Sequence, residues 1–156
     1  MNGADSKSVV DVLVKALGDE CVVVKNHLDN PDLLRQKRWV VEDLGGALHI
    51  LYQGSTLGLI DLGELSFATD FGCNAENLKD IPQSIADQAR EWAEQEMWPA
   101  WEARGYIVDP GAHPENGWDP LERLWLLNVI KKVEFVEALV EEIRWAANQE
   151  RIQFIQ

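Results

Sequence analysis

The stretch from Trp39 to Ala68 decides the fold, and it reads WVVEDLGGALHILYQGSTLGLIDLGELSFA. Its hydrophobic segments are short, and they are separated by Gly45-Gly46, Gly54-Ser55 and Gly63. Apolar and polar residues alternate around His49, which is typical of a strand with one buried face. Because short glycine-bearing turns join strands that run in opposite directions, the stretch predicts an antiparallel meander of about four strands. Three carboxylates are expected on the face that looks toward water or a partner: Glu42, Asp61 and Glu64.

The segments on either side of this stretch favour helices. Upstream, apolar residues recur at helical spacing from Ser8 to Leu17, and Gly18 offers a stop. Downstream, Pro82 stands where a helix can begin. A loop rich in glycine and proline is expected from Gly105 to Gly117.

The strongest local signal for a helix is Asp119-Pro120-Leu121-Glu122. It combines an aspartate N-cap, a proline at the first helical position and the glutamate of a capping box. We therefore expect a long helix to begin there. Apolar residues at intervals of three and four continue from Val129 to Ala147. This face is expected to pack inward or against a second copy of the chain, as a homodimer through the C-terminal helix.

The order of these segments predicts an α+β fold, with an N-terminal helix, an antiparallel sheet of about four strands, and then two or three helices packed on one face. We expect a single domain over residues 1–156, sheet-rich from 20 to 70 and helical from 82 to 149. A chain of this length can bury a core large enough to fold without disulfide or metal staples.

The net charge of −13 is concentrated in two segments. Residues 39–78 hold six carboxylates and no lysine or arginine, and residues 91–122 hold eight carboxylates against one arginine, so the segments carry −6 and −7. Such a chain is repelled by phosphate backbones, and direct nucleic-acid binding is not expected. One compact basic group is expected to flank a strand and to pair with nearby carboxylates: Arg35, Lys37 and Arg38.

The sequence lacks signals for export or membrane insertion. No apolar run approaches the roughly 18 residues of a membrane span, and the N-terminus lacks the basic and apolar regions of a leader. Cys21 and Cys73 match no paired metal or redox spacing. We therefore expect a soluble cytoplasmic protein with two buried thiols and no membrane partner.

The second acidic segment also carries four of the seven tryptophans. Carboxylates steer a basic partner over long range, and exposed aromatic rings anchor it at short range. The sequence therefore favours a non-catalytic acidic binding module that contacts a basic protein partner, as an inhibitor, an immunity protein or a chaperone-like protein. The expected partner-binding residues are Trp98, Trp101, Trp118, Glu94, Glu96, Glu102 and His113.

Two alternatives stay open at this point. The first is a carboxylate-metal-dependent hydrolase of a small molecule or nucleotide, because carboxylates three residues apart share a helix face and can hold one divalent cation when another segment adds ligands. The second is a small-ligand-binding domain with its pocket between the sheet and the helices. No cofactor is expected beyond such a divalent cation, whose candidate ligands are Glu91, Glu94, Glu115 and Asp119.

The three histidines lie in unrelated sequence contexts. His27 lies in a turn-rich segment, His49 on an expected strand, and His113 in the loop rich in glycine and proline. This scatter argues against a zinc site or a histidine-based catalytic triad, and His49 is interpreted as a structural residue.

Overall fold

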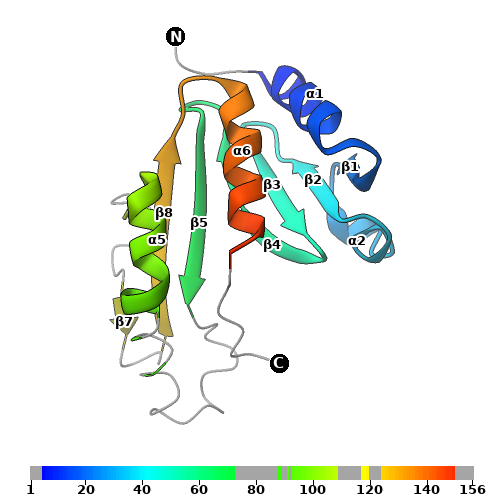
Figure 1. Cartoon of the computed structure of the whole chain (residues 1–156). Coiled ribbons are helices and arrows are strands. Elements are labelled where there is room, and N and C mark those ends of the chain that lie inside the picture. The colour runs from blue at the N-terminus through cyan, green and yellow to red at the C-terminus, as the bar shows by residue number, and fades with distance from the viewer. Residues whose placement is uncertain are drawn as a thin grey trace. The chain divides into compact units, whose positions relative to one another are not determined.

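The computed structural model describes residues 5–72, 88, 91, 93–108, 117–119 and 124–149 (Figure 1). The chain divides into two compact units. Unit 1 consists of Met1–Ala68 with Lys132–Gln149, and unit 2 consists of Thr69–Lys131 with Glu150–Gln156. The single domain expected from the sequence stays a prediction.

Unit 1 contains the meander that the sequence predicts. β2 (Trp39–Asp43), β3 (Ala47–Tyr52), β4 (Ser55–Asp61) and the start of β5 (Ser66–Gly72) pair in sequence order, each antiparallel to the next. β1 (Cys21–Val24) lies parallel to β2 on its other side. The predicted meander is therefore confirmed and is extended by one parallel strand.

The turn between β3 and β4 consists of Gln53 and Gly54, whose φ angles are both positive at 51° and 85°. Two-residue hairpins favour such mirror-image turns, because their twist matches that of the strands. Gly58 is required for a different reason. A Cβ atom at this position would lie 2.4 Å from the backbone oxygen of Ala68, so β4 and β5 pair closely only because residue 58 has no side chain.

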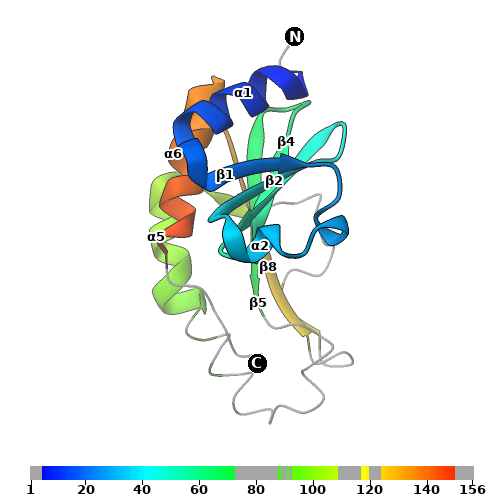
Figure 2. The ribbon, with the colours of Figure 1, turned by 90° about the vertical axis from the view of Figure 1, so that its right-hand side faces the viewer.

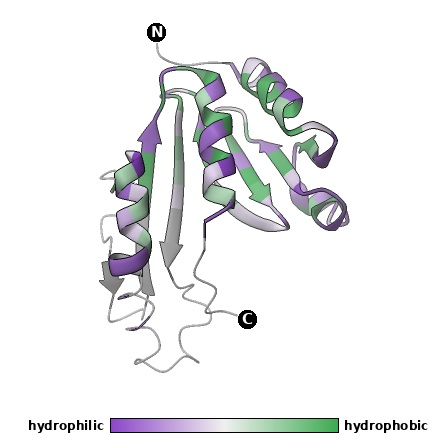
Figure 3. Cartoon of the chain, viewed as in Figure 1, coloured by the Kyte–Doolittle hydropathy of each residue, from purple (hydrophilic) through white to green (hydrophobic). Residues whose placement is uncertain are grey.

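Two long helices of unit 1 lie on one side of these strands (Figures 1 and 2). α1 (Ser6–Leu17) begins after Asp5, whose carboxylate accepts a 2.9 Å hydrogen bond from the backbone N–H of Ser8. α6 (Val136–Ala147) packs against α1 and β4. Hydrophobic and hydrophilic positions alternate along both helices in Figure 3, as expected for helices with one buried face. The buried core of unit 1 includes Val9, Leu13, Leu48, Ile50, Ile60, Leu139 and Ile143.

Short elements join the N-terminal helix to the meander. η1 (Gly18–Glu20) follows α1, and η2 (His27–Asp29) and α2 (Leu33–Gln36) lie between β1 and β2. The side chain of Asn26 caps η2 by accepting a 2.9 Å hydrogen bond from the backbone N–H of Leu28. This cap fixes the backbone at the start of η2.

Unit 2 contains η3 (Ala93–Met97), α5 (Trp98–Arg104) and three strands. β6 (Ile107–Val108) and β7 (Gly117–Asp119) both pair antiparallel with β8 (Leu124–Lys132). β6 therefore interrupts the loop expected between residues 105 and 117. The expected helix start at residue 82 lies outside the described residues.

The segment Leu124–Lys132 departs most from the sequence-based prediction, because it forms a strand and not the first half of a long helix. Asp119 lies in β7, and residues 120–123 lie outside the described residues. Six of the nine residues of β8 are apolar, and pairing with β6 and β7 engages the backbone at 124–126 and at 129–130. The C-terminal helix begins only at Val136.

The α+β class is confirmed, with an N-terminal helix, a mostly antiparallel sheet and helices after it. The strands outnumber the four expected, because β1 and three segments after residue 106 also form strands. α6 buries its apolar face inside unit 1, so nothing in the packing of this helix supports the predicted homodimer. Within the described ranges, no helix has the length and apolar character needed to cross a bilayer.

Candidate functional site

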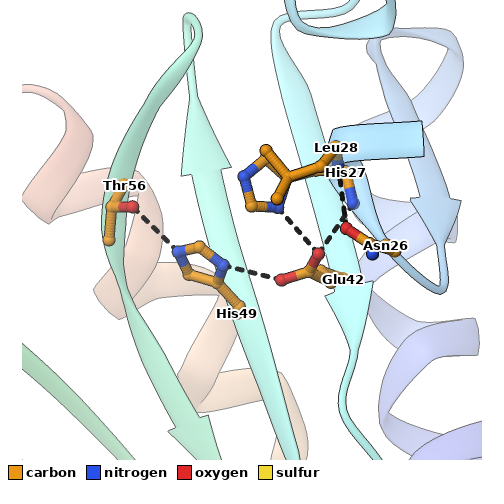
Figure 4. A network of polar contacts seen from close by, with 6 residues as sticks. All are labelled: Asn26, His27, Leu28, Glu42, His49 and Thr56. Carbon is orange, nitrogen blue, oxygen red and sulfur yellow. Dashed lines mark hydrogen bonds and ion pairs between the residues drawn. The ribbon is translucent and has the colours of Figure 1, made fainter. Parts of the chain in front are cut away.

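Three side chains from different segments of unit 1 meet in one polar cluster, which we call the His27–Glu42–His49 cluster (Figure 4). Glu42 on β2 pairs directly with His49 on β3, so both side chains project from the same face of the sheet. His27 is the first residue of η2, and the Asn26 cap holds this turn beside Glu42. The register of β2 and β3 therefore positions Glu42 and His49, and the capped turn positions His27.

Glu42 lies between the two histidines and bonds to both. Its Oε2 atom accepts a 2.7 Å hydrogen bond from the backbone N–H of His27 and lies 2.7 Å from Nδ1 of the same residue. Its Oε1 atom lies 3.0 Å from Nδ1 of His49. The two imidazole rings stand edge to face, with their centroids 5.6 Å apart. Both Nδ1 atoms therefore point at one carboxylate.

Thr56 on β4 extends the cluster to a third strand. Its Oγ1 atom lies 2.8 Å from Nε2 of His49. Two lone pairs cannot bond to each other, so the Nδ1 atom that faces the Glu42 carboxylate carries a proton, and Nε2 of a neutral His49 accepts from the Thr56 hydroxyl. A hydroxyl can also accept a hydrogen bond, so Thr56 can serve the other tautomer of His49 as well.

Glu42 is buried, and its expected position toward water is wrong. Its side chain is 8% exposed, because η2 covers this part of the sheet face. Burial raises the pKa of Glu42, but hydrogen bonds from the His27 backbone N–H and from the two imidazoles outweigh burial and lower the pKa from 4.5 to about 2. The Glu42 carboxylate is therefore ionised at neutral pH.

The cluster offers the ligand types of a transition-metal site. One ring nitrogen from each histidine and a carboxylate oxygen of Glu42 all lie within 4.8 Å of one another. Two ligand atoms of a tetrahedral zinc ion, each about 2.1 Å from the metal, lie about 3.4 Å apart, so the three side chains have to rotate before they bind a single ion. The histidine side chains are 23% and 19% exposed, which leaves a path from solvent. No other group of three such ligands occurs among the described residues.

The residues predicted from the acidic, tryptophan-rich segment differ in how far they are exposed. Glu91, Glu96 and Glu102 are exposed, and Trp98 is half-buried at the start of α5. Trp101 is only 3% exposed and packs edge to face on Tyr106, so its expected role as a surface anchor is wrong. Large aromatic side chains are mostly buried in folded proteins, and Trp101 follows this tendency.

The remaining predicted residues are described only in part or not at all. Glu94 lies in η3, and Trp118 and Asp119 lie in β7, but their side chains are outside the described part of the chain. His113 and Glu115 lie outside it altogether. Of the four predicted carboxylate ligands, only Glu91 has a described side chain, so the carboxylate metal site stays a prediction.

Two of the three residues of the His27–Glu42–His49 cluster could be paired from the sequence. A turn at Gly45-Gly46 puts Glu42 opposite His49, so this pair could have been read from the meander alone. His27 could not be assigned in this way, because its position depends on the parallel pairing of β1 and β2 and on the chain reversal at η2.

The chain matches no protein family model, no curated protein and no solved structure. Its function therefore has to be argued from its own residues.

Proposed function

We propose that this protein binds a divalent transition metal ion, of which Zn²⁺ is the representative, at the His27–Glu42–His49 cluster. One observation carries the proposal: three atoms of metal-ligand type, from three separate segments, lie within 4.8 Å of one another around a carboxylate that stays charged. Two imidazoles and one carboxylate are a ligand set that zinc uses in proteins.

The ligand chemistry selects among metals. Imidazole nitrogen suits zinc, copper, nickel and iron, whereas magnesium and calcium prefer sets made of oxygen ligands. Three protein ligands leave a fourth position of a tetrahedral zinc ion for water or for a group from a partner. We therefore expect the His27–Glu42–His49 cluster to bind zinc and not to bind magnesium or calcium.

Thr56 supports the proposal from outside the ligand set. When Nδ1 of His49 binds a metal, its proton must leave and Nε2 must carry the ring hydrogen. The Thr56 hydroxyl, 2.8 Å away, then accepts that hydrogen and fixes the ring orientation.

A thermal-unfolding titration of chelator-stripped protein tests the proposal. Zn²⁺ in excess should raise the melting temperature, because a ligand at 100 times its dissociation constant stabilises the native state by about 2.7 kcal/mol. Mg²⁺ and Ca²⁺ should leave it unchanged. The shift should vanish in His27→Gln and His49→Gln and persist in Glu137→Gln, an exposed carboxylate of α6. A zinc shift retained by both histidine variants would refute this site.

A second candidate function is the acidic binding module for a basic protein partner. The observation that favours it is the exposure of Glu96 on η3 and Glu102 on α5, beside the half-buried Trp98. In this second candidate function, Glu96, Glu102 and Trp98 contact the partner, whereas Trp101 does not, because it is buried. It includes the cytoplasmic location expected from the sequence, and it leaves open whether two copies associate.

Association kinetics with a lysine-rich peptide test this second candidate. Neutralising Glu96 and Glu102 to glutamine should slow association and reduce its salt dependence, because these carboxylates steer the peptide. The matched control neutralises Glu137 and Glu141, which are exposed on α6 and change the net charge equally. If the two pairs of substitutions have equal effects, net charge alone acts and the surface is not a binding site.

A further inference from the structure

Unit 1 contains a solvent-open hollow of about 610 Å³ on a different part of its surface, lined largely by the segment from α2 to the start of β2 and by the β3–β4 turn. We call it the basic hollow. The lining residues that matter for its chemistry are Glu20, Arg35, Lys37, Arg38, Gln53 and Gly54.

The charge of the hollow opposes the charge of the chain. Three cations and one carboxylate line it, in a protein whose net charge is −13. The sequence led us to expect that these cations pair with nearby carboxylates. Among the described residues, the side chains of Arg35 and Arg38 have no ion pair or hydrogen bond, while Lys37 Nζ donates a 2.7 Å hydrogen bond to the backbone oxygen of Asp19. Two guanidinium groups are therefore available to a ligand.

The backbone of the hollow is fixed on both sides. The backbone N–H of Gln53 donates a 2.8 Å hydrogen bond to the oxygen of Arg38, which ties the β3–β4 turn to the start of β2. The backbone N–H of Lys37 donates a 2.9 Å hydrogen bond to the oxygen of Leu33 and closes α2. Gln53 holds a left-handed φ of 51°, a conformation that costs a residue with a side chain about 1–2 kcal/mol. The backbone that lines the hollow is therefore ordered before a ligand binds.

We propose that the basic hollow binds a small phosphate-bearing molecule. Arginine presents a planar fork of donors that matches phosphate oxygens, and two arginines among the lining residues suit a doubly charged group. The volume lies within the range of small-molecule sites and exceeds what inorganic phosphate alone fills. Glu20 supplies an acceptor for a hydroxyl or ammonium group on the remainder of the ligand. A free molecule is favoured over a phosphate headgroup in a membrane, because the chain's net negative charge is repelled by an anionic surface.

Calorimetric titration of metal-free protein in a non-phosphate buffer tests this inference with two probes, inorganic phosphate and glycerol phosphate. Both should bind with one-to-one stoichiometry, and glycerol phosphate should bind more tightly. The double variant Arg35→Gln/Arg38→Gln should weaken binding at least tenfold, a loss of the size that one charge-assisted hydrogen bond provides. Lys7→Gln/Lys15→Gln, which removes two exposed charges from α1, should bind like the wild type.

The proposed metal site makes a separate prediction in this assay. His27→Gln, which removes a proposed metal ligand, should bind glycerol phosphate normally, so the two sites can fail independently. The basic hollow is refuted if neither probe binds, or if the arginine variant and the lysine control lose affinity equally. A third arm uses vesicles that contain phosphatidic acid. Binding to these vesicles without binding to the free probes would assign the hollow to a membrane surface and overturn the proposal.

Discussion

Glu42 and His49 lie directly opposite each other on β2 and β3, with Oε1 of the glutamate 3.0 Å from Nδ1 of the histidine. The pair places a charged carboxylate on a sheet face that η2 covers. Burying a charge is costly unless it is hydrogen-bonded, and the Glu42 carboxylate has hydrogen bonds to the His27 backbone N–H and to both imidazoles. The cluster is therefore important for stability as well as for the proposed metal binding.

Replacing Glu42 with glutamine should lower the free energy of unfolding by about 1–3 kcal/mol, because it removes a charged acceptor and leaves buried donors poorly satisfied. Urea denaturation of the metal-free protein measures this. The control is Glu64→Gln, an exposed carboxylate paired with Lys132 at 3.8 Å, which should change stability by less than about 1 kcal/mol. A Glu42 variant as stable as the control would show that the hydrogen bonds contribute little.

Stability should fall at acid pH because of the same carboxylate. The pKa of Glu42 is about 2 in the folded chain against an ordinary value of 4.5, so below pH 4.5 the unfolded state takes up a proton that the folded state does not. The stabilisation is complete above pH 4.5 and disappears as the pH falls toward 2. Urea unfolding of the wild type and Glu42→Gln across this window should give converging stabilities. Parallel curves would contradict the lowered pKa.

Gly58→Ala should destabilise unit 1 by about 1–3 kcal/mol, the usual cost of forcing an extra group into a packed position. The new Cβ would lie 2.4 Å from the Ala68 oxygen and 2.6 Å from the Phe67 ring, and one of these neighbours must move. Gly46→Ala is the matched control, since a Cβ there has nothing within 4 Å. Thermal unfolding of the two variants measures this difference, and equal melting temperatures would contradict the steric role of Gly58.

Cys21 should react slowly with alkylating reagents. Burial raises the pKa of its thiol from 9.0 to about 11, although Lys37 acts in the opposite direction. Since only the thiolate attacks, a pKa of 11 in place of 9.0 makes the rate near pH 8 about a hundredfold lower than that of an exposed thiol. Iodoacetamide kinetics on a Cys73→Ser variant measure Cys21 alone, and urea should restore the ordinary rate. Fast alkylation of the folded variant would show that the thiol is accessible.

Local sequence features were sufficient for the meander and for α1. Gly45-Gly46 and Gly54 mark turns with short loops, and the Val9 and Leu13 face of α1 has helical spacing. The sequence does not predict the strand from Leu124 to Lys132, because the Asp119-Pro120-Leu121-Glu122 signal and the three- and four-residue spacing of apolar residues after Val129 both favour a helix. Its pairing with β6 and β7 is a tertiary interaction that outweighs the Asp119-Pro120 helix signal.

The site was harder to predict than the fold. Net charge and tryptophan content drew attention to residues 91–122, where Trp101 proved to be buried. The separation of the histidines in the sequence argues against a shared site, yet Glu42 brings His27 and His49 together. Spacing along a chain is a weak guide to ligands that come from a strand pair and a separate turn, because their proximity is created by the sheet.

The most direct test of the central claim is X-ray absorption spectroscopy of the protein loaded with one equivalent of Zn²⁺. Binding at the His27–Glu42–His49 cluster should give nitrogen and oxygen ligands at about 2.0–2.2 Å with the outer-shell scattering of imidazole rings, and His49→Gln should lose part of that scattering. Sulfur at about 2.3 Å would place the ion on cysteine, and a spectrum unchanged in His49→Gln would exclude this histidine. Either result, or zinc that does not bind, would contradict the proposed metal site.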